Sequence, residues 1–381
     1  METFHRRNCQ KEMVKVVFLM TACKKSGPVQ QMLNIIKHLD TAVYEPHLVT
    51  LYPEPTEDSQ LEKYLPYVKH HYAPTGKIAM VLGLDKNLRA LLDEIQPDVI
   101  HSLGVFPDFA VSRMKKWKQV ITSRNFVYED YPAKFGKIQG IILAWLHLYA
   151  MKRTCKTLAC SESLSKIYKE RLGLQFDYIR NGVDVEQYTM PTSDEKENIR
   201  KELNLPENTF VFVYTGQIIE RKNLGFLLES YTSSFNGNDT YMLILGGGAL
   251  LDGYKEQFGQ YKNVEFRGSV QNVNQYLKAC DVYVSTSKSE GLPNGVLEAM
   301  ATGLPVVLSD IEQHMEIYNV DPKIGFVYRQ GEKGELVDRM KEIIPMAKEM
   351  GVTAYQTAHE HFSAKGMSMR YQELYKQIAI K

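Results

Sequence analysis

The chain has 381 residues, of which 44% are hydrophobic and 24% are charged, and its formal net charge is +1 at pH 7. This length exceeds that of a typical single domain, so we expect two domains, each with its own core. The balanced charge argues against nucleic acid as an overall electrostatic partner. The basic residues are concentrated early in the chain: residues 1–183 hold 26 Lys and Arg against 18 Asp and Glu, whereas residues 184–381 hold 20 against 27.

The cysteines favour a reducing compartment. Their number is odd, and they form neither a C-x-x-C pair nor a zinc-type spacing with His, so we expect reduced thiols and no metal site. They are Cys9, Cys23, Cys155, Cys160 and Cys280. No apolar run reaches the roughly 18 residues of a membrane-spanning helix, so we expect a protein that is soluble or lies on a membrane surface.

The front half reads as alternating strands and helices. Residues 1–12 are polar and predicted to be disordered, and the apolar run 14–20 predicts a first strand. A loop containing Gly27 then leads into a helix that ends near residue 39. Strands near 47–51, 98–101 and 120–123 alternate with helices near 87–95 and 107–116, which favours a parallel, doubly wound sheet. Ligands of such sheets bind at the carboxyl ends of strands, and Arg124 follows one of these ends.

A helical stripe at 134–153 allows two interpretations. Its apolar residues are Phe135, Ile138, Ile142, Trp145, Leu146 and Tyr149, and Lys134, Lys137, Lys152 and Arg153 flank them. The stripe could be the buried side of a core helix with solvated ends. It could also be an interfacial helix, because such helices combine apolar burial with attraction to anionic lipid.

Strands near 155–160 and 176–180 complete the front half, and the Asn-Gly pair at 181–182 predicts a sharp turn between domains. The second half opens with a buried strand at 210–215, followed by Gly216, Gln217 and the basic pair Arg221 and Lys222. A strand at 241–245 leads into three glycines, 246–248. A dinucleotide fingerprint would need a further glycine where Leu251 stands, which weakens an oxidoreductase interpretation.

Residues 285–309 carry the strongest functional signal. A strand at 281–284 leads through a turn at 290–293 to a helix at 294–302, which Gly303 ends. Free amides at a helix N-terminus attract anions, and Gly291 and Gly295 let a ligand approach the backbone closely. Glu290 and Glu298 repel phosphate, so we expect them to accept hydrogen bonds from sugar hydroxyls on either side of it. A ligand with hydroxyls, phosphates and hydroxyls in series is a nucleotide-sugar.

The string S-E-G-L-P-x-x-x-L-E-A-M-A-x-G-x-P-V-V, which contains both glutamates, resembles the retaining glycosyltransferases of family 4. The resemblance implies an α/β GT-B fold, with two facing Rossmann-like domains and a deep interdomain cleft. It places an acceptor-side domain at 1–183 and a donor-binding domain at 184–362, with a closing helix at about 363–381 packing back on the first domain. The family needs no metal or other cofactor.

The resemblance also implies roles for individual residues. Glu298 would bind the ribose and Glu290 the transferred sugar, while Lys222 and Arg221 would hold the diphosphate. Arg124 stands where the family often has His, and could hold a phosphate or an acceptor hydroxyl. Gln217 replaces a common Arg. The further donor-binding positions are Gly27, Gly216, Arg267, Gly268, Ser269 and Val270, and the turn Gly291, Leu292, Pro293 and Asn294.

The resulting hypothesis is a retaining transferase that moves a hexose-type sugar from a nucleotide-sugar, with UDP favoured, to a glycan or a polyprenyl- or other lipid-linked acceptor. We expect it to serve capsular or other envelope polysaccharide or glycolipid synthesis, in the cytoplasm, at the inner face of the cell membrane. The alternatives are a GT-B epimerase or phosphorylase, a non-catalytic nucleotide-sugar-binding assembly partner, and an oxidoreductase.

Overall fold

The computed structural model describes residues 13–235, 237 and 239–379, so the prediction made for residues 1–12 lies outside the described residues. The chain divides into two compact units. The first comprises the described residues of Met1–Thr122, Leu143–Thr157 and Ser368–Lys381, and the second those of Ser123–Ile142 and Leu158–Met367. The domain limits predicted from the sequence, 1–183 and 184–362, stay a prediction.

The first sheet has seven strands in the order β3-β2-β1-β4-β5-β6-β7. Its strands are β1 (Val14–Met20), β2 (Tyr44–Thr50), β3 (Lys69–Tyr72), β4 (Val99–Leu103), β5 (Lys118–Ser123), β6 (Lys156–Ala159) and β7 (Asp177–Tyr178). The pairs that β1 forms with β2 and β4 are parallel, as expected. The edge strand β3 was not predicted, because its sequence Lys-His-His-Tyr has no apolar run.

The helices of the front half are α1 (Gly27–Lys37), α2 (Leu61–Tyr64), α3 (Lys77–Leu82), α4 (Lys86–Ile95), α5 (Val105–Ser112), α6 (Val127–Phe135), α7 (Lys137–Arg153) and α8 (Glu162–Leu172). The continuous helical stretch expected at 134–153 is wrong at its start. Gly136 adopts a φ of +79°, which ends α6 before α7 begins. The helix α1 starts at Gly27 because Ser26 caps it and Pro28 occupies its first turn.

Helices cover both faces of the first sheet. Side chains of α3, α4 and α5 pack against β1, β2 and β4 in one buried cluster. The other face receives the helix α17 (Ala364–Ala379), whose Tyr375 hydroxyl lies 2.6 Å from His101 Nδ1 and whose Tyr371 hydroxyl lies 2.9 Å from Thr122 Oγ1. His101 is therefore a buried structural histidine.

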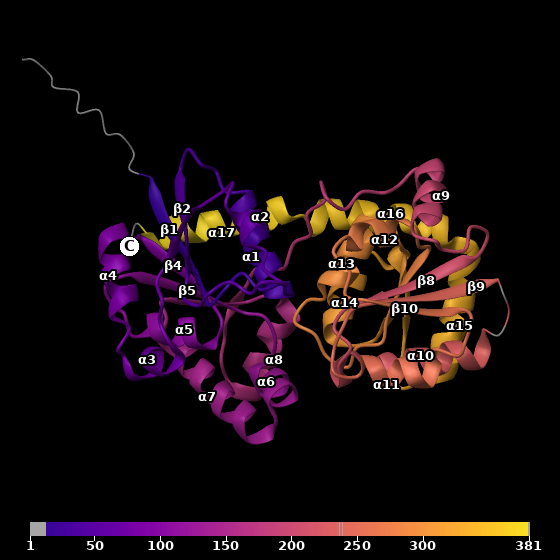
Figure 1. Cartoon of the computed structure of the whole chain (residues 1–381), viewed down its shortest axis with the longest axis horizontal. Coiled ribbons are helices and arrows are strands. Elements are labelled where there is room, and N and C mark those ends of the chain that lie inside the picture. The colour runs from indigo at the N-terminus through magenta and orange to yellow at the C-terminus, as the bar shows by residue number, and fades with distance from the viewer. Residues whose placement is uncertain (1–12, 236, 238, 380–381) are drawn as a thin grey trace, which may run out of the picture. The chain divides into compact units, whose positions relative to one another are not determined.

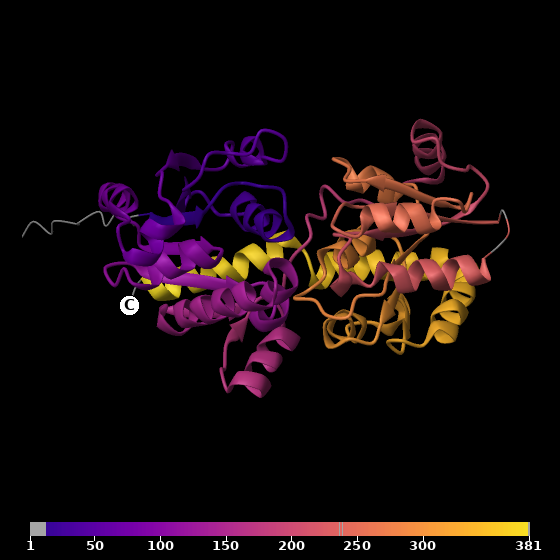
Figure 2. The same cartoon turned by 60° about the horizontal axis from the view of Figure 1, so that its bottom comes forward.

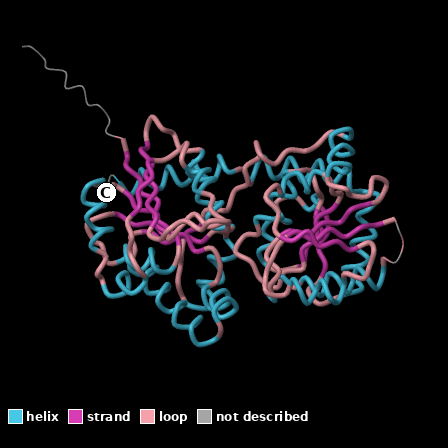
Figure 3. The backbone as a smooth tube through the Cα atoms, in the orientation of Figure 1, coloured by secondary structure: helices cyan, strands magenta, loops and turns pink. Residues whose placement is uncertain are grey.

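The second sheet has six strands in the order β10-β9-β8-β11-β12-β13. Its strands are β8 (Phe210–Thr215), β9 (Thr240–Leu245), β10 (Val264–Gly268), β11 (Val282–Ser285), β12 (Val306–Ser309) and β13 (Gly325–Tyr328). The described pairings are parallel, so both halves have the predicted α/β architecture. Figure 3 shows the strands of this unit enclosed by helices.

The helices of this half are α9 (Ser193–Glu202), α10 (Leu224–Ser234), α11 (Leu251–Phe258), α12 (Val273–Lys278), α13 (Asn294–Ala301), α14 (Glu312–Tyr318), α15 (Lys333–Ile343) and α16 (Ala347–His361). Three short 3₁₀ turns are η1 (Glu220–Lys222), η2 (Pro322–Ile324) and η3 (Ile344–Met346). In Figures 1 and 2, α10 and α11 lie on one side of the sheet, and α12, α13 and α16 lie on the other.

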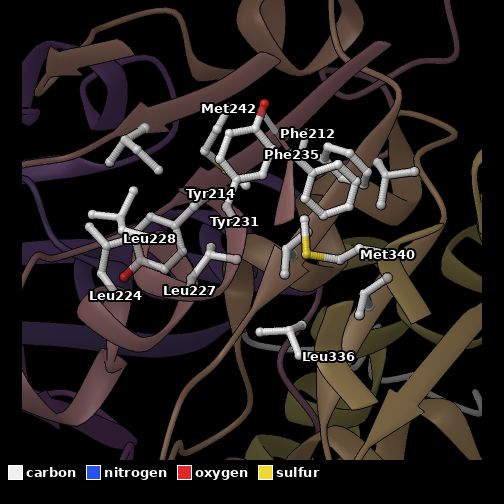
Figure 4. Close-up of a cluster of buried hydrophobic side chains, with 14 of the residues drawn as sticks. Phe212, Tyr214, Leu224, Leu227, Leu228, Tyr231, Phe235, Met242, Leu336 and Met340 are labelled. Atoms are coloured by element: carbon white, nitrogen blue, oxygen red, sulfur yellow. The ribbon is translucent and has the colours of Figure 1, made fainter. Parts of the chain in front are cut away.

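The core of the second unit fixes which side of each strand faces which helix. Phe212 and Tyr214 of β8 pack with Leu227 and Tyr231 of α10 and with Met340 of α15 (Figure 4). Because side chains alternate along a strand, the intervening residues of β8 face α13 on the opposite side. None of the described helices combines the length and apolarity that crossing a bilayer requires.

Candidate functional site

The candidate site lies at the carboxyl ends of β8 and β11. These strands are neighbours, and the strand order reverses between them, since β9 lies on one side of β8 and β12 on the other side of β11. Such a reversal is where parallel α/β sheets bind ligands. The amide of Lys288 donates to the carbonyl of Arg221 at 2.8 Å, which joins the two loops that follow the strands.

Glu290 is the centre of this cluster. Its side chain is buried, and Lys222 Nζ donates to its Oε1. Arg221 Nη1 lies 3.0 Å from Oε2, and Ser287 Oγ donates to Oε1 at 2.7 Å. Arg221 also approaches Asp130 of α6, with 4.0 Å between Nη2 and Oδ1. The structure thus brings together Glu290, Lys222 and Arg221, three of the residues predicted to contact the donor.

The electrostatics of this cluster favour the ionised forms of Glu290 and Arg221, whereas burial outweighs the attraction of Glu290 for Lys222 and lowers the pKa of that amine. Burial alone would raise the pKa of the Glu290 carboxyl, but the charges of Lys222 and Arg221 and the hydrogen bonds from Lys222 and Ser287 outweigh it and hold the pKa at about 2. Burial opposes the charge of Arg221 as well, yet Glu290 and Asp130 raise its pKa. Two fixed cations therefore stand beside one carboxylate, an arrangement that can bind a diphosphate and a hydroxyl side by side.

A buried histidine, His314, contacts the strand ends that precede the Glu290 loop. His314 Nε2 lies 3.2 Å from Ser285 Oγ, and its Nδ1 lies 3.0 Å from the carbonyl oxygen of Ser309. Ser309 Oγ donates to the carbonyl oxygen of Ser287 at 2.8 Å, and Ser287 Oγ in turn donates to the Glu290 carboxylate. Burial lowers the pKa of His314 to about 4, so the imidazole is neutral at pH 7.

The loops next to this cluster contain glycines at positions where a side chain would not fit. A Cβ on Gly246 would lie 1.8 Å from the carbonyl oxygen of Gly216, and one on Gly247 would lie 2.9 Å from Ser269 Oγ. The loops after β8, β9 and β10 are therefore in contact, and the predicted base-reading backbone at 267–270 belongs to them. The side chain of Arg267 is bound to Glu265 and to the carbonyl of Leu203.

The second glutamate reaches the same region. Tyr283 of β11 donates to the carbonyl of Thr215 at 3.1 Å. Burial raises the pKa of Tyr283, and the charges of Glu290 and Glu298 both act in the same direction, so both carboxylates lie within electrostatic range of one phenol. The helix α13, which carries Glu298, packs tightly here, since a Cβ on Gly295 would lie 2.6 Å from the Tyr283 hydroxyl.

Arg124 packs against the turn at 290–293. Its Nη1 donates to Asn181 Oδ1 at 2.6 Å, and Asn181 Nδ2 donates to the carbonyl of Leu292 and to Asn294 Oδ1, each at 3.1 Å. A Cβ on Gly291 would lie 1.8 Å from the carbonyl oxygen of Arg124. Within the described residues, Nε and Nη2 of Arg124 are buried without a hydrogen-bond partner, so this guanidinium has donors for a phosphate or a hydroxyl.

Gly27 and Gln217 were also predicted to bind the donor, and two residues of the site were not anticipated. Gly27 belongs to the first unit, at the start of α1, and the side chain of Gln217 is exposed. No role in the site was predicted for Asn181 or His314. Asn181 had a signal in its Asn-Gly pair, but we interpreted that pair only as a turn. In the described part of the chain, no group of three or more His, Cys, Asp or Glu side chains is placed to hold a metal ion.

Two Rossmann-like domains, each built on a parallel sheet, are the architecture of glycosyltransferases with the GT-B fold. Residues 195–357 match the family model described as glycosyl transferases group 1, and residues 25–187 match that described as glycosyltransferase family 4. Together these matches cover most of the chain, which belongs to the family 4 glycosyltransferases.

Individual relatives agree with this assignment. The O-antigen biosynthesis glycosyltransferase WclY of Escherichia coli is 23% identical over 380 residues, covering 96% of this chain and 99% of that protein. The UDP-Gal:alpha-D-GlcNAc-diphosphoundecaprenol alpha-1,3-galactosyltransferase of Escherichia coli is 27% identical over 274 residues, covering 67% and 70%. Among solved structures, Anabaena HepE in complex with UDP and glucose superposes with a TM-score of 0.78 at 17% identity, covering 96% of this chain and 100% of that one.

Proposed function

We propose that this glycosyltransferase moves a hexose from a UDP-sugar to a glycan or a polyprenyl-linked acceptor with retention of the anomeric configuration. The observation that carries the proposal is the buried Glu290, held between Lys222 and Arg221 at the carboxyl end of β11. Two relatives add support: the galactosyltransferase takes UDP-Gal and a diphosphoundecaprenol acceptor by its name, and HepE was solved with UDP and glucose.

In the proposed reaction, the bond from the anomeric carbon to the diphosphate oxygen breaks while the acceptor hydroxyl bonds to the same face of that carbon. The hydroxyl proton passes to the departing phosphate oxygen, so no protein base is required. Lys222 and Arg221 stabilise the negative charge that develops on the diphosphate. The backbone N–H groups of Gly291, Leu292 and Asn294 add to this field, because Pro293, which precedes α13, has no N–H and offers no side-chain cap.

The carboxylates would orient the uncharged parts of the donor. Glu290 would accept hydrogen bonds from the transferred sugar and Glu298 from the ribose, while the backbone at 267–270 would contact the base. Arg124 would bind a phosphate or an acceptor hydroxyl with its two remaining nitrogens. We further propose that the reaction belongs to envelope polysaccharide or glycolipid synthesis in the cytoplasm, beside the inner face of the cell membrane.

The test begins with thermal-shift measurements on a panel of nucleotide-sugars, followed by release of free nucleoside diphosphate with and without a polyprenyl-linked sugar acceptor. We expect UDP-hexoses to raise the melting temperature, and diphosphate release to require the acceptor. Lys222→Met should abolish both responses. Lys288→Met, which removes an exposed amine that pairs with Glu220, is the matched control and should preserve them.

Each part of the proposal can fail separately. Protection by none of the sugars would refute the donor assignment, and diphosphate release that does not depend on acceptor would favour a hydrolase or an epimerase. Nuclear magnetic resonance of the product linkage decides the stereochemistry, because a β-linked product from an α-linked donor would refute retention.

A further inference from the structure

Exposed large hydrophobic side chains are concentrated in two short segments. Ten of the nineteen such side chains in the described part of the chain lie within residues 78–84 and 135–149. They are Ile78, Val81, Leu82 and Leu84 on α3 and its following loop, and Phe135, Ile138, Ile141, Ile142, Trp145 and Tyr149 at the end of α6 and along α7. We call this set the α3–α7 surface. Such a concentration marks an interaction site.

The helix α7 presents a stripe to solvent. Ile138 is 77% exposed, Ile142 60% and Trp145 61%, whereas Ala144 and Met151 are buried. Spacings of three and four residues place the exposed side chains on one face of the helix. The interpretation of this stripe as the buried side of a core helix is therefore wrong.

Within the first unit, α5 connects α3 to the end of α7, which belongs to that unit from Leu143 onward. The ring centroids of Tyr149 and Phe109 lie 5.8 Å apart, and the guanidinium carbon of Arg113 lies 4.7 Å from the Phe109 ring centroid. Arg113 Nη1 in turn donates to the carbonyl of Val81 at 2.8 Å. The apolar residues of α3 and those at the end of α7 thus border one helix, α5 (labelled in Figure 1).

Only basic charges accompany these apolar residues on α3 and α7. The helix α7 carries Lys137, Lys152 and Arg153 and no acidic residue, and α3 carries Lys77 and none. The nearest carboxylate after α3, Asp85, is buried and paired with Arg89. On α5, Asp108 is buried and lies 2.8 Å from His147 Nε2. On α6, Glu129 pairs with Arg171 and the buried Asp130 pairs with Lys134, so the exposed face is apolar and cationic.

We infer that the α3–α7 surface docks the protein on an anionic phospholipid bilayer. Interfacial helices bury an apolar face at the headgroup boundary and gain further affinity from nearby Lys and Arg. Aromatic side chains such as Trp145 and Tyr149 are favoured at that depth. The inference serves the proposed function, because a bilayer would present a lipid-linked acceptor, but binding to vesicles needs no catalysis.

The experiment is vesicle co-sedimentation of the full chain. We expect binding to vesicles that contain phosphatidylglycerol, and at least tenfold weaker binding to pure phosphatidylcholine. The double substitution Ile138→Ser, Trp145→Ser should weaken binding to the anionic vesicles at least tenfold. Lys152→Gln and Arg153→Gln should weaken it about fivefold each, the equivalent of about 1 kcal/mol per basic residue.

A second pair of exposed apolar residues provides the matched control. Val352→Ser, Met369→Ser removes side chains that are also exposed but lie on α16 and α17, and it should leave vesicle binding unchanged. All variants should keep the wild-type melting temperature, since every substituted side chain is at the surface.

Three outcomes would overturn the inference: no binding to either vesicle, binding that the Ile138 and Trp145 substitutions leave intact, or a dimer by light scattering that those substitutions dissolve. A soluble acceptor separates this inference from the proposed function. If transfer to that acceptor persists in the double variant, only docking has been removed, whereas absent transfer in the wild type would refute the function instead.

Discussion

Replacing Glu290 by Gln should lower stability and activity without weakening diphosphate binding. The change removes the carboxylate that two buried cations share. The fall of its pKa from 4.5 to about 2 corresponds to roughly 3 kcal/mol of stabilisation. Because the folded pKa lies below the unfolded value, this stabilisation is complete above about pH 5 and is lost as the pH falls toward 2. Calorimetry at pH 7 should show a melting temperature lower by roughly 6–12 °C.

The effects on binding and turnover should have opposite signs. In the free protein Glu290 occupies Lys222 and Arg221, the cations that the diphosphate would also use, so Glu290→Gln should bind UDP at least as tightly as the wild type. Sugar transfer should fall at least about 100-fold, because the sugar loses its orienting carboxylate. Isothermal titration with UDP and a turnover assay measure the two effects separately.

The matched control is Glu220→Gln. Glu220 also neighbours the basic pair in sequence, but its side chain is 79% exposed and pairs with Lys288 at the surface. Its substitution should change stability by less than about 0.5 kcal/mol. Two results would contradict these expectations: a melting temperature of Glu290→Gln equal to that of the wild type, or an affinity for UDP that falls in parallel with turnover.

Three further substitutions probe the surroundings of the site. His314→Asn should flatten the dependence of stability on pH between about 6.5 and 4. The wild type loses stability on acidification in this range, because the buried imidazole resists protonation. If denaturant titrations give both proteins the same slope of unfolding free energy against pH, this prediction is wrong. Gly246→Ala should abolish thermal protection by UDP because its Cβ has no room, whereas Gly253→Ala, with open space on α11, should stabilise by about 0.5–1 kcal/mol. Glu316→Ala should cost roughly 2–4 kcal/mol by urea unfolding, since this carboxylate pairs with Arg180 and accepts two amides at the start of α8; a loss no larger than that of exposed Glu312→Ala would refute its role.

Much of the fold could be predicted because local signals and burial agree. The run Phe210–Thr215 is nearly continuously apolar, as is typical of a strand covered on both faces, and α13 ends just before Gly303, which adopts a φ of +81°. The strand β3 could not be predicted in the same way. It lies at a sheet edge and is held by its pairing with β2 rather than by apolar burial.

The residues of the candidate site also fall into those that the sequence predicts and those that it does not. The convergence of Glu290, Lys222 and Arg221 was predictable, because the glutamate turn and the basic pair each follow a parallel strand. The roles of His314 and Asn181 were not predictable, because they depend on contacts that tertiary folding creates: His314 of α14 with Ser285 and Ser309 of two strands, and Asn181 with Leu292, 111 residues away. An apolar stripe at helical spacing has the same sequence whether it is buried or exposed, so only the structure distinguishes the two for α7. The ligand-binding roles of all these residues stay predictions.

The packing of α17 has a consequence for synthesis on the ribosome. Tyr371 and Tyr375 are fully buried against the strands of the first sheet, and Ser368 Oγ donates to the carbonyl of Ile35 at 2.7 Å. These residues are translated after every strand of both sheets. Part of one face of the nascent first sheet therefore stays uncovered while the 185 residues between β7 and α17 emerge, a period in which a chaperone would protect it from aggregation.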